Sequence, residues 1–236
     1  MCGRFSLMAP ASAIADAFNV VGIPEFEPRY NIAPTQQTLV LNAPDGHVQA
    51  ELMRWGLIPF WADDPKIGSK LINARSETAS KKTSFRTALT HRRCLVITDG
   101  FYEWQRVDGK KQPWRIVSHN AGPFAMAGLW ERWFDVDGQQ IRSFTVLTTS
   151  ANAFVAPVHA RMPVILSPED HAQWLDPTVR DKAVINALMV PCHPGRLARY
   201  RVSTHVNSVR NQDARCAAPL PDESWLMGQD WEPPDA

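Results

Sequence analysis

The sequence predicts an α+β fold: a curled, barrel-like and mainly antiparallel β-sheet with a few peripheral helices. Short runs rich in apolar and β-branched residues recur along the chain. Asp-Gly pairs at 108–109 and 137–138 stand between such runs, where glycine supplies the positive φ of a tight hairpin turn. Segments with helical features are fewer, so we expect the helices to lie at the edges of the sheet.

The expected strands, in chain order, cover residues 37–41, 48–55, 94–98, 101–105, 114–117, 124–130, 141–148, 164–166 and 200–203. Because the two Asp-Gly turns join neighbouring runs, residues from about 94 to 148 are predicted to form an antiparallel meander.

Four helices are expected. Residues 10–18 are rich in alanine, residues 76–89 carry part of a basic run, and residues 178–189 are amphipathic. Ser167 is a suitable N-cap and Pro168 fits the first helical position, so residues 171–175 should continue a helix. No repeat or low-complexity linker divides the sequence. We therefore expect one domain over residues 1–216, followed by an acidic, flexible tail over residues 217–236.

Composition excludes several classes of protein. The chain has 236 residues, 44% of them hydrophobic, which is enough to bury a core. No apolar run approaches the roughly 18 residues that a membrane span requires, and the first residues lack the pattern of a secretion signal. The four cysteines are widely spaced, which argues against a disulfide framework. We expect a soluble, cytoplasmic, monomeric protein with no membrane partner.

The formal net charge of +1 conceals an uneven distribution of charge. Between Lys66 and Arg93 there are eight basic residues and a single acid, Glu77, whereas the last 20 residues hold five acids and no base. A basic groove with an acidic tail would produce this asymmetry, and so would a solvated helix face.

Cys2 has an unusual position. Because residue two is small, we expect Met1 to be removed, which leaves an amine and a thiol on one residue, both partly reactive near neutral pH. The thiol could act as a nucleophile with the amine as its base. Alternatively, amine and thiol could condense with an aldehyde, first to a Schiff base and then to a thiazolidine ring. Strand-like residues follow Cys2 at once, which favours a buried position over an incidental cysteine at a frayed end.

Three further segments carry polar groups suited to proton transfer or anion binding. Glu103 lies in an apolar run, where burial would raise its pKa, unless it occupies the solvent face of an alternating strand. His159 and Arg161 lie two residues apart in a stretch bounded by prolines, and they offer a proton shuttle and a phosphate ligand, or a hydrogen-bonded loop. Asn73 places an amide beside Arg75, although a turn residue is the alternative.

Other site classes fail on spacing. A zinc deaminase needs H-x-E and P-C-x-x-C, whereas this chain offers only Pro-Cys-His-Pro at 191–194. The motifs H-E-x-x-H, G-x-S-x-G and G-x-x-x-x-G-K-[ST] do not occur in the sequence. We therefore expect neither a metal nor a cofactor.

Seven blocks in order resemble the SOS response-associated peptidase (SRAP) family. They are MCGRF at 1–5, RYNIAP at 29–34, RWGLIP at 54–59, INARSET at 72–78, GFYEW at 100–104, HARMP at 159–163, and Val206-Asn207 with Asn211. Each block alone is weak, but together they span nearly the whole chain to about Cys216, which makes the resemblance specific.

The resemblance implies a fold of the SRAP type and an autocatalytic cysteine-type peptidase that removes its own Met1. It also implies that the exposed cysteine traps the ring-opened aldehyde of an abasic site in single-stranded DNA as a covalent thiazolidine, which shields the lesion. Cys2 would supply the crosslink, and Asn73 would orient the Cys2 amine or the sugar hydroxyl. Glu103 would be the general acid and base for both reactions. His159 would protonate the sugar oxygen on ring opening and assist reversal.

DNA contacts follow from the same resemblance. Phosphates would be held by Arg4, Arg75 and Arg161, and the groove would be lined by Asn31, Pro34, Trp61, Thr148, Asn207 and Arg210. Two acids, Asp63 and Asp64, follow Trp61, so local packing is the alternative for that residue. When bound to DNA, the protein would be associated with the nucleoid.

Two other functions stay open. An N-terminal-nucleophile amidohydrolase of the glutamine amidotransferase kind can also begin with Met-Cys-Gly, although Arg4-Phe5 follows here and the basic block has no role in that chemistry. A plain single-stranded DNA-binding module, with Cys2 incidental, would bind intact and abasic strands equally.

Overall fold

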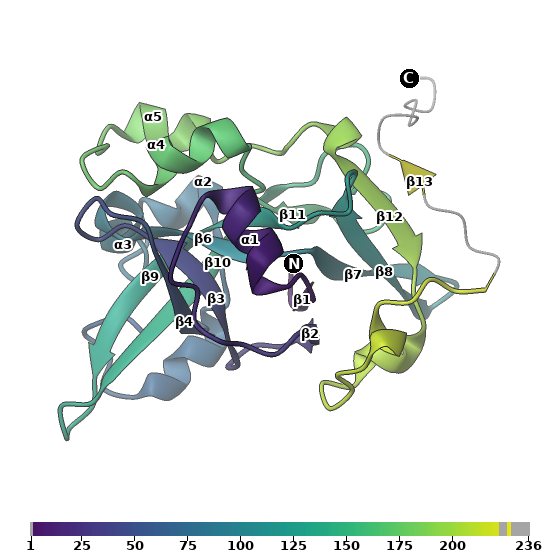
Figure 1. Ribbon diagram of the computed structural model, residues 1–236, viewed down its shortest axis with the longest axis horizontal. Helices are drawn as coiled ribbons and strands as arrows, with labels where there is room; N and C mark the ends of the chain where they lie inside the picture. The colour runs from purple at the N-terminus through teal and green to yellow at the C-terminus, as the bar shows by residue number, and fades with distance from the viewer. Residues whose placement is uncertain (1, 222–225, 228–236) are drawn as a thin grey trace.

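The computed structural model describes residues 2–221 and 226–227, which form two sheets with short helices around them (Figure 1). One sheet has the strand order β13-β12-β8-β7-β1-β2, and the other has the order β11-β10-β4-β3-β6-β9. In the second sheet β9 also pairs with β10. This pairing closes β10, β4, β3, β6 and β9 into a barrel, which removes the free edges of those strands.

The barrel strands are β3 (Gln37–Asn42), β4 (Gln49–Trp55), β6 (Arg93–Thr98), β9 (Phe124–Phe134) and β10 (Gln140–Ser150), and β5 (Asn73–Arg75) and β11 (Arg161–Pro163) pair with β10. The other sheet contains β1 (Phe5–Leu7), β2 (Arg29–Ile32), β7 (Gly100–Val107), β8 (Lys110–Ser118), β12 (Leu197–Arg201) and β13 (Leu226–Met227). The helices are α1 (Ala11–Phe18), α2 (Ser76–Ala79), α3 (Arg86–His91), α4 (His171–Leu175) and α5 (Lys182–Ala187). Single 3₁₀ turns are η1 (Pro65–Lys70), η2 (Pro168–Asp170), η3 (Pro194–Arg196), η4 (Thr204–Asn207) and η5 (Ala214–Cys216).

The predicted fold class is confirmed, with one refinement. Most strand pairs are antiparallel, but β10 runs parallel to both β4 and β5, so the barrel is mixed. Both hairpins predicted from Asp-Gly pairs are present, as β7–β8 and β9–β10, and Gly109 and Gly138 each have a φ of 77°.

The predicted continuous meander over residues 94–148 is wrong. Strand β6 pairs with β3 and β9 in the barrel, whereas β7 and β8 belong to the other sheet, so the chain changes sheet at Asp99. The Asp99 carboxylate accepts hydrogen bonds from Ser6 Oγ (2.6 Å), Ala9 N (3.0 Å) and Arg115 Nη2 (2.9 Å). These tertiary contacts fix the crossing and also anchor β1, and the local sequence carries no sign of them.

Several element bounds differ from the prediction. Residues 76–89 form two helices, α2 and α3, because the intervening segment is rich in serine and threonine and Phe85 turns into the core. The last expected helix shortens to α5, which begins where the Asp181 carboxylate caps Ala183 N at 2.7 Å. Residues 164–166 make only an isolated bridge, between Ile165 and Met126. Strands β2, β5, β11 and β13 are additional to the predicted ones, whereas β1 lies where strand was expected just after Cys2.

Aromatic packing joins the two sheets. Phe5 in β1 lies 4.8 Å from the Trp55 ring in β4, and Trp55 stacks 6.4 Å from Phe144 in β10, measured between ring centroids. All three side chains are fully buried. Because Phe5 is held in this cluster, the residues just before it are held at the junction between barrel and sheet.

The sequence predicts a flexible tail after residue 216 and no membrane span, and the described residues bear on both expectations. In the expected tail, Leu226–Met227 pairs with β12 as β13, and the other residues after 221 lie outside the described part of the chain. Among the described residues no helix has the length and apolar character that crossing a membrane would require.

Candidate active site

Cys2 is fully buried at the junction between the barrel and the six-stranded sheet. Asn73 Nδ2 donates a hydrogen bond to the Cys2 carbonyl oxygen at 2.7 Å, and Cys2 Sγ lies 4.0 Å from the Arg4 carbonyl oxygen. Asn73 is the first residue of β5, which pairs with Val146 of β10. A residue of the barrel thus holds a residue that precedes β1, so Cys2 is not at a frayed end.

The other side of the Asn73 amide is available for a ligand. Its Oδ1 atom is buried and accepts no hydrogen bond from the described residues. A buried acceptor without a donor is unfavourable in a folded protein unless something else satisfies it. An amine on Cys2 would supply such a donor beside the clamped carbonyl.

Glu103 is buried in β7, with 3% of its surface exposed, so the alternative of a solvent-facing carboxylate is excluded. Burial raises the pKa of Glu103, and the nearby His159 imidazole opposes that rise. Burial also raises the pKa of the Cys2 thiol, and the negative charge of Glu103 adds to this rise. Cys2, Glu103 and His159 therefore lie within electrostatic range of one another. At neutral pH the Cys2 thiol is protonated and needs a base before it can react.

His159 is half-buried just before β11. His159 Nδ1 lies 3.0 Å from the backbone N–H of Arg161, from which it can accept a hydrogen bond in the tautomer that carries its proton on Nε2. The Arg161 carbonyl oxygen lies 3.1 Å from the same Nδ1 and can accept from it once the ring is protonated.

Arg161 connects this region to α2. Its guanidinium donates to both carboxylate oxygens of Glu77, at 2.6 and 3.0 Å, and to the Thr148 carbonyl oxygen at 2.6 Å. The hydrogen bond from Arg161 lowers the pKa of Glu77, which keeps that carboxylate ionised. Thr148 is fully buried and its Oγ1 accepts from Arg161 at 3.2 Å, so its side chain orients this arginine. Arg75, at the end of β5, is exposed.

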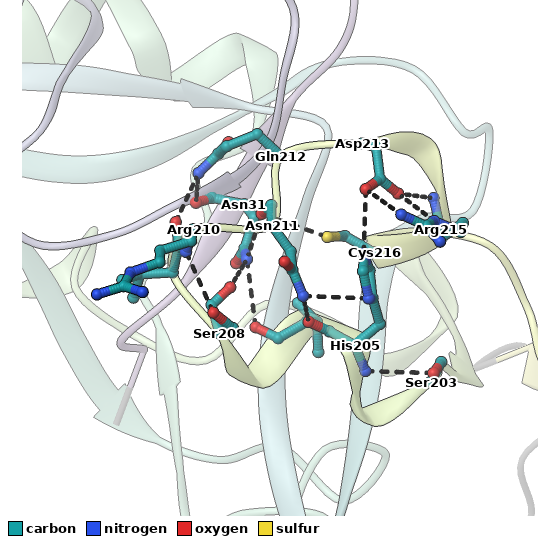
Figure 2. Close-up of polar contacts among 12 residues, drawn as sticks. Asn31, Ser203, His205, Ser208, Arg210, Asn211, Gln212, Asp213, Arg215 and Cys216 are labelled. Atoms are coloured by element: carbon teal, nitrogen blue, oxygen red, sulfur yellow. Dashed lines mark hydrogen bonds and ion pairs between the residues drawn. The ribbon is translucent and has the colours of Figure 1, made fainter.

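A second group of contacts surrounds Asn31, which is fully buried in β2 (Figure 2). Asn31 Oδ1 accepts from Arg4 Nη1 at 2.6 Å. Asn31 Nδ2 faces the carbonyl oxygens of Val206, Ser208 and Asn211 at 3.2, 2.9 and 2.8 Å. The amide thus ties the segment 204–216, which carries Asn207 and Arg210, to the sheet beside Cys2.

The same segment contains a polar cluster of His205, Asp213 and Cys216, whose ligand atoms all lie within 4.8 Å of one another (Figure 2). Among the described residues, only these have the spacing of a metal site. The Asp213 oxygens, however, accept from Arg215 Nε and Nη2, both at 2.9 Å, and His205 Nε2 lies 3.0 Å from Oδ2. Ordinary hydrogen bonds within the segment account for this cluster.

Trp104 is a half-buried residue that was not singled out from the sequence. Its Nε1 donates to Asn207 Oδ1 at 2.7 Å, and the Arg4 guanidinium lies 5.9 Å from its ring centroid. Trp104, Lys111 and Asn207 line an open hollow. Alternation along β7 carries no signal for this residue, because Trp104 shares its face of the strand with Tyr102, which is fully buried.

The structure brings together Cys2, Asn73, Glu103 and His159, and it joins Arg4, Asn31 and Asn207 through direct contacts. Other residues that were expected to contact DNA lie outside both groups. Trp61 has 44% of its surface exposed beside Phe60, Pro34 is half-buried and Arg210 is exposed. The contacts among the described residues do not connect these three side chains to Cys2, so their contact with DNA stays a prediction.

The fold is a closed mixed barrel, and its site places a buried cysteine beside a carboxyl and an imidazole. Together they define a class of protein with a potential cysteine nucleophile at the junction of barrel and sheet. The chain belongs to the SOS response associated peptidase (SRAP) family, because the model of that family matches residues 1–209. The resemblance drawn from the seven sequence blocks is thereby confirmed.

Relatives and solved structures agree with this assignment. The abasic site processing protein YoqW of Bacillus subtilis (strain 168) is 41% identical over 215 residues, covering 89% of this chain and 96% of YoqW. The abasic site processing protein YedK of Escherichia coli (strain K12) is 32% identical over 227 residues, covering 93% of this chain and all of YedK. A crystal structure of a protein from Bacteroides thetaiotaomicron superimposes with a TM-score of 0.83 at 26% identity, covering 93% of this chain and all of that one.

Proposed function

We propose that this protein processes abasic sites in single-stranded DNA by forming a covalent thiazolidine crosslink through Cys2, after it has removed its own Met1. The observation that carries the proposal is the buried Cys2, held by Asn73 beside Glu103 and His159. The printed names of the relatives YoqW and YedK, both abasic site processing proteins, support the same substrate.

In the first step, hydrolysis of the Met1–Cys2 peptide bond consumes one water and frees the Cys2 amine. A general acid and base must take a proton from the attacking group and deliver one to the leaving amine. Glu103 fits this role because burial raises its pKa towards neutrality, and because its charge already acts on Cys2. The Asn73 amide holds the carbonyl oxygen of the following peptide bond, Cys2–Gly3, which fixes the position of Cys2 while the Met1–Cys2 bond is cleaved.

In the second step, the freed amine attacks the aldehyde carbon of the ring-opened abasic sugar, and water leaves as the Schiff base forms. Cys2 Sγ then adds to the same carbon, and the thiol proton passes to the nitrogen, which closes the five-membered ring. Because the pKa of the Cys2 thiol is raised, Glu103 is needed as its base. Asn73 Oδ1 accepts a hydrogen bond from the amine, and His159 delivers the proton that opens the sugar ring.

Positioning of the strand depends on charge and stacking. Arg4, Arg75 and Arg161 supply phosphate ligands around the site. Trp104, with Arg4 above its ring, provides a face on which a base can stack. We propose that the protein acts as a monomer in the cytoplasm, on the nucleoid when DNA is bound.

A crosslinking assay tests this proposal. Purified protein is incubated with a single strand that carries one abasic site, heated in denaturant and separated by electrophoresis, with the intact strand as control. We expect a heat-stable adduct with the abasic strand only, and none with Cys2→Ala. Cys2→Ser keeps the amine but not the thiol, so we expect an adduct only after borohydride reduction of the Schiff base. An unreduced, heat-stable adduct with either variant, or none with the native protein, would contradict the proposal.

A further inference from the structure

A hollow of about 290 Å³ lies between α3 and α5, away from Cys2, and the proposed chemistry does not use it. Figure 1 shows α5 beside α2 and α3 at one end of the barrel. The polar residues that line it are Ser80, Arg86, Thr87, Thr90, Lys182 and Asn186. We call this feature the α3–α5 hollow. Its polar groups include a guanidinium, an ammonium, three hydroxyls and an amide, and all of these can donate hydrogen bonds.

The two cations of the α3–α5 hollow have no acidic partner in the described part of the chain. Among these residues, no ion pair involves Arg86 or Lys182, whereas Arg92 is paired with Glu131 and Arg161 with Glu77. Arg86 and Lys182 are both exposed, and no acid of the described chain competes with a ligand for them.

The surroundings of the hollow are positively charged. Asp181 lies next to Lys182 in sequence, but its carboxylate caps the backbone of α5 at Ala183. Lys81 and Lys82 are exposed in the turn between α2 and α3. Desolvation lowers the pKa of His91, which also lines the hollow, and the nearby cations Arg180, Arg92 and Arg93 lower it further. A positive potential of this kind attracts an anion.

The hollow is connected to the active site by a short piece of chain. Asn73, which holds Cys2, begins β5, α2 follows β5 directly, and Ser80 at the end of α2 lines the hollow. Two strand steps and five helical steps span at most about 14 Å. Phosphates along one DNA strand are spaced by about 3.4 Å per nucleotide when the bases are stacked, and by more when the strand is stretched. The Ser80 edge of the hollow therefore lies within about four nucleotides of Asn73, the residue that holds Cys2.

We propose that the α3–α5 hollow is a second phosphate-binding site, which takes a backbone phosphate of the same single strand about four nucleotides from the lesion. The inference rests on the proposed function, since it assumes a strand held at Cys2. Arg86 provides the planar guanidinium that binds phosphate oxygens in pairs, and Lys182 provides a point charge. The Ser80 and Thr87 hydroxyls and the Asn186 amide complete the donor set, whereas the Thr90 hydroxyl donates to the Arg86 carbonyl oxygen.

Strand length tests this inference without any crosslink. The affinity of the native protein for intact single strands of 3 to 12 nucleotides is measured by fluorescence anisotropy. We expect affinity to rise by roughly tenfold when the strand becomes long enough to reach the hollow, because one charge-assisted phosphate contact is added. Arg86→Gln and Lys182→Gln should each reduce this rise, and the double variant should abolish it. The slope of log affinity against log salt should then fall by roughly 0.7 for each phosphate that is no longer neutralised.

Arg132→Gln is the matched control, because Arg132 is an exposed arginine of the β9–β10 hairpin, which extends beyond the barrel (Figure 1). It removes the same charge and should keep the full rise. If Arg86→Gln and Arg132→Gln behave alike, the inference is wrong. Titration with inorganic phosphate separates the two sources of the anion. Binding of inorganic phosphate that needs Arg86, without any dependence on strand length, would overturn the assignment to DNA.

Failure of the inference and failure of the proposed function give different results. Arg86→Gln should crosslink a short abasic strand, which cannot reach the hollow, as well as the native protein does. A loss of crosslinking with that short strand would overturn the separation of the two sites. If the native protein forms no crosslink but keeps the Arg86-dependent rise with strand length, the proposed function fails and the phosphate site stands.

Discussion

Replacement of Asn31 by alanine is expected to destabilise the protein strongly, because this one buried amide joins three parts of the chain. It accepts from Arg4 Nη1 at 2.6 Å and faces three backbone carbonyl oxygens of the segment 204–216. Nδ2 has two hydrogens, so the three carbonyl contacts represent two full hydrogen bonds. Asn31→Ala removes all of these contacts. Each carbonyl keeps one other donor, which is Arg4 Nη1 for Val206, the backbone N–H of Asn211 for Ser208 and Cys216 Sγ for Asn211.

The magnitude follows from the kinds of hydrogen bond that the substitution removes. A hydrogen bond to a charged group contributes about 1.5–3 kcal/mol and a neutral one about 1 kcal/mol, so Asn31→Ala should lower the free energy of unfolding by about 4 kcal/mol. This is a large part of the 5–15 kcal/mol that is typical of a folded domain. Backbone amides of residues 204–216 should also exchange hydrogen faster, since the segment is no longer anchored to the sheet.

Urea unfolding and hydrogen exchange measure both effects, and the chain offers a matched control. Asn42 in β3 is also fully buried, but neither its Nδ2 nor its Oδ1 has a hydrogen-bond partner among the described residues. Asn42→Ala removes the same atoms without breaking a bond, so it should change the unfolding free energy by less than about 1 kcal/mol. Equal losses of stability for Asn31→Ala and Asn42→Ala would refute the reasoning.

Three further predictions concern charged groups. Because burial raises the pKa of Glu103, the folded chain binds this proton more tightly than the unfolded chain, and the resulting stabilisation is lost as pH rises through the folded-state pKa. Glu103→Gln should therefore have a higher melting temperature than the native protein at pH 7.5, and this difference should vanish towards about pH 4. A native protein with the higher melting temperature at pH 7.5 would contradict this. Glu77→Gln should tighten binding of intact single strands, measured by anisotropy, because it frees Arg161 and removes an acid. It should change the unfolding free energy by less than about 1 kcal/mol, since the Glu77 side chain is half exposed, and weaker binding would count against this role. Arg115→Met should cost about 3 kcal/mol in urea unfolding because it leaves the buried Asp99 carboxylate without its cation, and an unchanged midpoint would show that the ion pair is dispensable.

The parts of the fold that could be predicted from the sequence are those decided locally. The Asp-Gly turns determined both hairpins because a positive φ is a property of one or two residues. The change of sheet at Asp99 could not be predicted, because it depends on Ser6, Ala9 and Arg115, which are distant in sequence. Strands of three residues, such as β5 and β11, are too short to show a periodic pattern.

The candidate site could likewise be predicted only in part from the sequence. Chemistry and family resemblance singled out Cys2, Asn73, Glu103 and His159 as residue types, but only tertiary structure shows that they lie together. The burial of Asn31 could not be predicted either, because its partners come from the segment 204–216 across the sheet.

The mass of the intact protein, measured with and without an abasic single strand, tests the central claim most directly. We predict that the purified protein lacks Met1. After incubation, its mass should increase by that of the DNA strand less one water, with the modification mapped to Cys2 in a digest. A protein that retains Met1, or an adduct located on any other residue, would contradict the account.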